Sequence, residues 1–121
     1  MSKRTEVAEQ FISRVRAKQF GETAAFLAEN VVLTVPGIGP IEGRGGVEAA
    51  LRMASESGRG LERVGWSAPC EEADGTVVLA GKAPPGLLGI VAKLLKKQVA
   101  VTVTCAFADD DKIAKLDIVT A

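Results

Sequence analysis

A strand–turn–strand pattern in residues 30–44 constrains the fold of this chain more than any other stretch. Val31, Leu33 and Val35 occupy every second position, which places their side chains on one face of a strand. Pro36 ends the strand because proline has no backbone N–H to donate to a neighbouring strand, and the glycines that follow provide the turn. Helical patterns precede this segment, and strand patterns dominate after it. The sequence therefore predicts a helical beginning followed by a sheet.

Three helices are expected, two before this segment and one after it. In residues 5–18, apolar side chains recur at spacings of three and four residues, which is typical of a helix with one buried face. A shorter helix is expected over residues 22–28. A third helix is expected to start at Gly45 and Gly46 and to end at residues 57–58.

The second half of the chain is predicted to be mainly antiparallel strands, over residues 61–70, 76–83, 99–108 and 113–119. Along residues 99–108, one set of alternating side chains is expected to face the core and the other to face solvent or a partner subunit. Asp74 and Gly75 are a typical hairpin turn. Cys70 and Cys105 are predicted to point inward as small buried side chains.

Residues 84–97 interrupt the strand pattern with apolar side chains at helical spacing and three lysines near the end. Cations are favoured at the C-terminal end of a helix because of its dipole. Three interpretations are open: an amphipathic connector on the core or at a dimer interface, a lid over a pocket, or an interfacial membrane helix. The connector is the default interpretation.

Two residue types that often carry catalysis are missing from the sequence. The absence of histidine excludes histidine triads and histidine metal sites, and the absence of tyrosine removes a phenol that could polarise a carbonyl. Fifteen basic residues balance fifteen acidic ones, which argues against nucleic acid as a partner. No apolar run approaches the ~20 residues needed to span a bilayer. We expect a single cytoplasmic domain over residues 1–121, without metal or cofactor.

The predicted order of elements resembles that of the nuclear transport factor 2-like superfamily, most of all its SnoaL-like, ketosteroid isomerase-like and limonene epoxide hydrolase-like branch. The residues that carry this resemblance lie in segments 26–37, 41–47, 103–107 and 111–113. The resemblance implies an α+β cone, in which a strongly curved, mostly antiparallel sheet wraps around the N-terminal helices and leaves an apolar pocket open at one end. It also implies a hydrophobic small-molecule ligand and a cofactor-independent isomerase, polyketide cyclase or epoxide hydrolase.

The catalytic positions of these relatives fall mostly on apolar residues in this chain. In the ketosteroid isomerase-like members, the tyrosine, the general-base aspartate and the protonated acid match Phe11, Val35 and a position near Val103. In the epoxide hydrolase-like members, the matching positions lie at or near Val32, Thr34, Lys82, Pro84 and Ile118, with Asp117 as a neighbour.

Lys82 and Asp117 are the candidate catalytic residues. An amine facing a dry pocket could act as a base or as a Schiff-base nucleophile, whereas the alternative for Lys82 is a solvated lysine at a strand end. Asp117 would be a pocket acid only if the last strand shifted by one residue, because the strand pattern otherwise places it outside. The predicted pocket lining consists of Phe11, Val15, Val35, Trp66, Val103, Cys105, Leu116 and Ile118.

Three functions fit these observations. The chain could be an enzyme acting on a hydrophobic molecule, a non-catalytic carrier or sensor of a lipophilic ligand, or a dimerisation module. A homodimer is expected through the outer strand face formed by Ala100, Thr102, Thr104 and Ala106. We expect small-molecule binding, and the resemblance favours an enzyme over a carrier.

Overall fold

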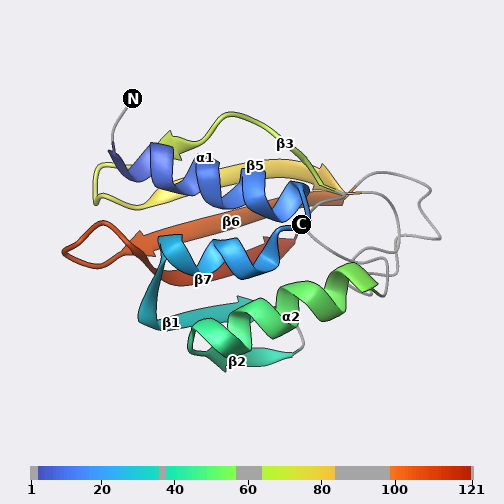
Figure 1. The fold of residues 1–121 in the computed structure, drawn as a ribbon. Helices are drawn as coiled ribbons and strands as arrows, with labels where there is room; N and C mark the ends of the chain where they lie inside the picture. Colours follow the sequence, from blue (N-terminus) through green and yellow to red (C-terminus); the bar gives the residue numbers. More distant parts are fainter. Residues whose placement is uncertain (1–2, 36–37, 57–63, 84–98, 121) are drawn as a thin grey trace.

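The computed structural model describes residues 3–35, 38–56, 64–83 and 99–120. In chain order its elements are α1 (Lys3–Arg16), the 3-10 helix η1 (Phe20–Phe26), β1 (Leu27–Val35), β2 (Gly39–Glu42), α2 (Arg44–Glu56), β3 (Gly65–Trp66), β4 (Cys70–Glu71), β5 (Val77–Ala83), β6 (Val99–Phe107) and β7 (Ile113–Thr120) (Figure 1). The segment 84–97, with its predicted helical spacing, lies outside the described residues.

The strands form one curved sheet with the order β2-β1-β7-β6-β5-β3, and β4 also pairs with β5. Neighbouring strands are antiparallel except β1 and β7, which run parallel. The pairing shifts register between Leu27 and Val32 in β1 and between Ala106 and Phe107 in β6. Such irregularities increase the local bend and twist of a strand. The predicted α+β fold with a strongly curved, mostly antiparallel sheet is confirmed. The sheet is open, with β2 at one edge and β3 and β4 at the other.

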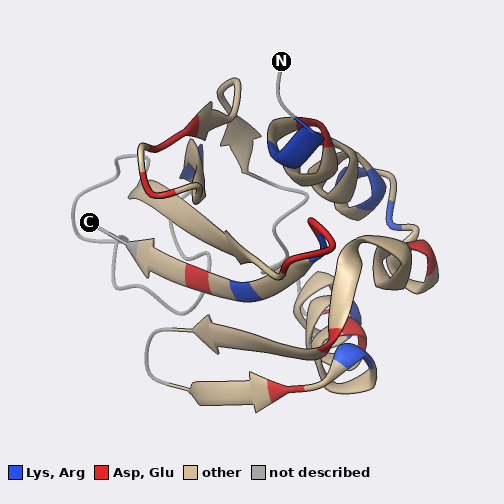
Figure 2. Cartoon of the chain, turned by 90° about the vertical axis from the view of Figure 1, so that its left-hand side faces the viewer, with Lys and Arg blue, Asp and Glu red and all other residues tan. Residues whose placement is uncertain are grey.

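The helices of the described part lie on one side of the sheet, and the strands curve around them (Figures 1 and 2). Helix α1 contacts β4 and β5, whereas α2 contacts β1, β2 and η1. None of the helices in the described ranges is long and apolar enough to cross a membrane.

Side chains from α1 and from the inner face of the sheet form the hydrophobic core. Phe11 and Val15 of α1 are completely buried, and Val103 and Cys105 of β6 are exposed by no more than 1%. The predicted alternation along β6 is therefore confirmed. The other face of β6 is partly exposed, as expected for a strand with only one side on the core.

Most predicted helices and strands are confirmed with shifted ends, and two differ in kind. The second helix is a 3-10 helix rather than an α-helix. Of the strand predicted over residues 61–70, residues 61–63 lie outside the described residues, and the remainder holds the short strands β3 and β4, which are separated by residues 67–69. Pro69 lies in this link and has no N–H for the ladder. The break leaves Cys70 exposed, contrary to the prediction, whereas Cys105 is buried as predicted, and its burial raises the thiol pKa to about 12.

Arg4 joins the beginning of α1 to two hairpin turns. Its Nε lies 2.9 Å from Oδ1 of Asp111, and its Nη1 donates a 3.0 Å hydrogen bond to the carbonyl oxygen of Gly75. The guanidinium carbon also lies 5.4 Å from the ring centroid of Phe107. Gly75 belongs to the turn between β4 and β5, and Asp111 to the turn between β6 and β7. These contacts fix the helix against the side of the sheet that carries β4 and β5.

Candidate functional site

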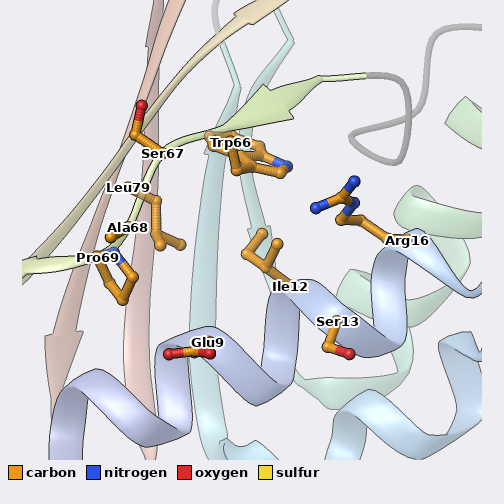
Figure 3. Close-up of a pocket in the computed structure, with 9 residues that line it drawn as sticks. All are labelled: Glu9, Ile12, Ser13, Arg16, Trp66, Ser67, Ala68, Pro69 and Leu79. Carbon is orange, nitrogen blue, oxygen red and sulfur yellow. The ribbon is translucent and has the colours of Figure 1, made fainter. Parts of the chain in front are cut away.

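A pocket of about 510 Å³ lies between α1 and the segment that links β3 to β4. This volume falls in the roughly 300–1,000 Å³ range of small-molecule sites. We call it the α1–β3 groove, and its lining residues are Glu9, Ile12, Ser13, Arg16, Trp66, Ser67, Ala68, Pro69 and Leu79 (Figure 3). The groove is open to solvent, since most of its polar residues are exposed.

One flank of α1 forms the helical wall of the groove. The helical wall residues follow each other at spacings of three, one and three residues, which places them on one face of a helix: Glu9, Ile12, Ser13 and Arg16. The adjacent flank of the same helix carries the core residues, including Phe11. Ile12 stands at the border between the two flanks and is only 5% exposed. The amphipathic pattern of α1 therefore supplies both a core face and a polar groove wall.

The strand wall of the groove depends on how β3 pairs with β5. Trp66 lies opposite Gly81, and Gly65 lies opposite Lys82 in this antiparallel pair. Gly81 has no side chain, and a Cβ there would come within 3.0 Å of Val64, of the Gly65 carbonyl oxygen and of the Trp66 ring. Directly after β3, the Ser67 N–H donates a 2.8 Å hydrogen bond to the Ala80 carbonyl oxygen. The close approach of β3 to β5 therefore positions Trp66 toward α1.

The floor of the groove is apolar, and its rim is charged. Ile12, Trp66 and Leu79 form the floor, and Leu79 is only 1% exposed. Figure 3 shows Arg16 at the Trp66 end of the groove and Glu9 at the Pro69 end. A ligand in this groove would meet an apolar surface between two opposite charges.

Within the described ranges, no group of three or more histidine, cysteine, aspartate or glutamate side chains is placed to hold a metal ion.

Two further hollows open on the surface, of about 420 Å³ beside η1 and about 440 Å³ beside the β6–β7 turn. The first contains Arg14 and Glu22, whose Nε and Oε2 atoms are 3.7 Å apart. The second contains Arg44, whose Nε donates a 2.9 Å hydrogen bond to the Leu27 carbonyl oxygen. The basic side chain in each hollow is thus already engaged within the protein.

Of the residues predicted to line the pocket, Trp66 lines the α1–β3 groove. The others are core residues with exposed fractions of 8% or less: Phe11, Val15, Val35, Val103, Cys105, Leu116 and Ile118. These seven side chains pack against one another instead of facing the groove, because both α1 and the inner sheet face present apolar residues to the same volume.

Lys82 and Asp117 lie on the outer face of the sheet. In β5 the buried positions are Val77 and Leu79, so alternation turns Lys82 outward, where it is exposed. In β7 the neighbours of Asp117 are buried, and Asp117 itself is partly exposed on the opposite face. The catalytic role of Lys82 and Asp117 stays a prediction, and their position on the outer face, away from the groove, does not support it.

The predicted site residues do not include the helical wall of the groove. The regular spacing of Glu9, Ser13 and Arg16 indicates that they share one face of a helix. The same spacing is found on the solvated side of most surface helices, so it does not identify a groove wall. Only the position of the β3–β4 link shows that this flank of α1 is a groove wall rather than open surface.

No protein-family model and no curated protein matches this sequence. Solved structures are similar over nearly the whole chain. An NTF2-like protein of unknown function from Cytophaga hutchinsonii is 16% identical with a TM-score of 0.73, covering 100% of this chain and 92% of that one. A steroid delta-isomerase from Pseudomonas aeruginosa is 16% identical with a TM-score of 0.73, covering 100% and 82%. A candidate SnoaL-like polyketide cyclase from Shewanella putrefaciens is 11% identical with a TM-score of 0.71, covering 99% and 80%.

These similarities concern the fold. The chain has the fold of the nuclear transport factor 2-like superfamily, as the resemblance in its sequence predicted.

Proposed function

We propose that this chain binds an apolar small molecule in the α1–β3 groove. The observation that carries the proposal is the floor of the groove, where Trp66, the one tryptophan of the chain, lies beside Ile12 and Leu79. Ligand sites typically combine such an apolar surface with a few polar groups at defined positions. Glu9 and Arg16 provide polar groups of this kind at the rim.

The size of the groove sets the expected affinity. A two-ring aromatic ligand that buried roughly 200 Å² of apolar surface would gain on the order of 5 kcal/mol at about 25 cal/mol per Å². This free energy would correspond to a Kd of about 0.2 mM if association cost nothing, so the Kd of such a simple probe lies above this value, because binding also costs translational and rotational freedom. Binding should therefore be measurable with simple aromatic probes, and a natural ligand with matching polar groups would bind more tightly.

Binding without turnover is the function that the groove supports best. An enzyme needs converging acid, base or donor groups, and the candidates Lys82 and Asp117 lie on the other face of the sheet. A carrier or sensor needs only the apolar floor and an orienting charge. The second candidate is a cofactor-independent isomerase, cyclase or epoxide hydrolase. The Glu9 carboxylate in the groove favours this candidate, because a carboxylate can act as a general base.

Filling the groove should abolish binding. In the Ala68→Phe variant, a large side chain occupies the space between the two walls, because Ala68 is an exposed lining residue. We expect the affinity for neutral naphthol to fall by at least about tenfold, the equivalent of losing ~1.4 kcal/mol. The measurement follows the indole N–H signal of ¹⁵N-labelled protein, which contains a single such signal because there is one tryptophan.

The control is Ala73→Phe, which adds the same side chain at an exposed position outside the groove, between β4 and β5. This variant should bind naphthol like the unchanged protein. Equal binding by the Ala68→Phe and Ala73→Phe variants would place the ligand elsewhere and would refute the proposal.

We also propose that two copies associate through the outer face of β5, β6 and β7. Among the described helices, none covers this face (Figures 1 and 2). Val119 is 52% exposed there, and Lys115 and Asp117 alternate on the same strand. A face with both charges can be complementary to itself about a two-fold axis, as a symmetric dimer requires.

A charge at the centre of this face should separate the copies. Thr102 lies between Ala80 and Val119 on the neighbouring strands, so Thr102→Glu would place two like charges close together across a two-fold axis. Sedimentation velocity should show a dimer for the unchanged protein and for the Ala73→Glu control, and a monomer for Thr102→Glu. A monomeric unchanged protein at concentrations of about 0.1 mM, where specific dimers of Kd near 1 μM are fully formed, would contradict the proposal.

A further inference from the structure

We infer that the α1–β3 groove selects a planar ligand with one acidic group, which lies at the Arg16 end while the far end of the ligand meets Glu9. This inference rests on the proposed function, because it assigns a ligand class and an orientation to the same groove. Both charged side chains line the groove, and both are exposed.

The Arg16 guanidinium is free to bind a ligand. Among the described residues, its side chain has no hydrogen-bond or ion-pair partner, in contrast to Arg14, which contacts Glu22 and Gln19. Arginine presents several N–H donors in a planar fork that matches a carboxylate, so it favours acids over other polar groups. The Arg16 end of the groove is therefore built to receive an anion.

The surroundings of Arg16 reinforce this preference. Lys18 lies two residues further along and is exposed, so it adds a second positive charge at this end of α1. The negative end of the helix dipole would oppose an anion, but the backbone there is engaged locally. The N–H groups of Ala17, Lys18 and Gln19 donate to the carbonyl oxygens of Ser13, Val15 and Arg14, which are among the last of the helix. This end of α1 consequently carries an excess of positive charge, to which Arg16 contributes from the groove and Lys18 from beyond it.

Trp66 defines the shape of the ligand. It lies at the same end of the groove as Arg16 and faces α1 across the floor (Figure 3). Aromatic rings pack against an indole in stacked or edge-to-face arrangements, which favours a flat ligand over a bulky one. The acidic group and the ring of one planar molecule can thus contact Arg16 and Trp66 together.

Glu9 determines the orientation. It precedes Arg16 by seven residues, which corresponds to about 10 Å along the helix axis at 1.5 Å per residue. Its side chain, like that of Arg16, has no ion-pair partner within the described ranges. A carboxylate accepts hydrogen bonds and repels a second acid, so a hydroxyl is favoured at this end and a diacid is disfavoured. The two rim charges therefore distinguish the two ends of the ligand.

The test compares three probes with the same ring system at neutral pH: naphthoate, naphthol and naphthylmethylammonium. Each is titrated into the full chain while the Trp66 indole N–H signal is followed. Naphthoate should bind about five- to tenfold more tightly than naphthol, since a well-placed charged hydrogen bond contributes on the order of 1 kcal/mol or more in a solvated site. In the Arg16→Gln variant this preference for naphthoate over naphthol should disappear.

The control variant is Arg14→Gln, which removes the same charge from the same helix but lies outside the groove. It should keep the preference for naphthoate. A naphthoate affinity no higher than that of naphthol, or an equal loss of preference in both variants, would overturn the ligand class and leave the binding proposal standing. If none of the three probes shifts the indole signal, the proposed function itself is wrong.

Discussion

Replacing Phe11 by alanine should lower the free energy of unfolding by about 3–5 kcal/mol, the usual cost of removing a buried phenylalanine ring. Phe11 is completely buried in the core between α1 and the inner sheet face. The void left by the ring would be enclosed by neighbours on both layers, so the structure could close it only in part. Urea denaturation followed by circular dichroism measures the change, and substitution of the exposed Ile38 by alanine is the control.

The same position tests how far this chain departs from the enzymes that it resembles. The resemblance of the sequence to the ketosteroid isomerase-like proteins implies that Phe11 falls at the position of their substrate-binding tyrosine, and Phe11→Tyr would place a hydroxyl there. Because Phe11 is buried among apolar side chains, the added hydroxyl should cost about 1–3 kcal/mol of stability if it finds no hydrogen-bond partner. A stable Phe11→Tyr variant that gained ligand affinity would show instead that the side chain faces a binding cavity.

The second large effect is expected for Gly81→Ala, which should separate β3 from β5. A Cβ at position 81 would lie 2.6 Å from Cγ1 of Val64, 2.8 Å from the carbonyl oxygen of Gly65 and 3.0 Å from Cε3 of Trp66. The carbonyl oxygen belongs to the backbone and cannot rotate away. We expect a loss of about 1–3 kcal/mol, which is typical of an overfilled core position.

The displacement of Trp66 gives this variant a second readout. The indole N–H signal should move in the absence of ligand, and naphthol binding should weaken because one wall of the groove has shifted. Gly45→Ala is the matched control, since a Cβ there meets nothing within 4 Å. It lies near the start of α2 and should be neutral or stabilising by up to ~1 kcal/mol. A Gly81→Ala protein as stable as the Gly45→Ala protein would contradict the close packing of β3 on β5.

The sequence predicts the local elements of this fold well because their buried faces repeat regularly. The alternation in residues 99–108 identifies the inner face of β6, where Val101 and Val103 are 1% exposed. The spacing in residues 5–18 likewise identifies the core face of α1. In both elements one face packs on the core, and the spacing of the apolar residues along the sequence indicates which face this is.

Other features depend on contacts between distant segments and leave no local pattern. The parallel pairing of β1 with β7 joins residues far apart in the chain, and nothing in either strand predicts its direction. The separation of β3 from β4 likewise depends on how each of them pairs with β5. The candidate site is likewise hard to predict from the sequence. Its helical wall is a polar flank of α1, and its other wall is the irregular link between β3 and β4.

The most direct test of the account is a crystal structure of the chain with bound naphthoate. We expect the ring of the ligand between Ile12 and Trp66, above Leu79, with its carboxylate at the Arg16 guanidinium and its far edge toward Glu9. Ligand density inside the core, beside Phe11 and Val103, or an empty groove at saturating naphthoate, would contradict it.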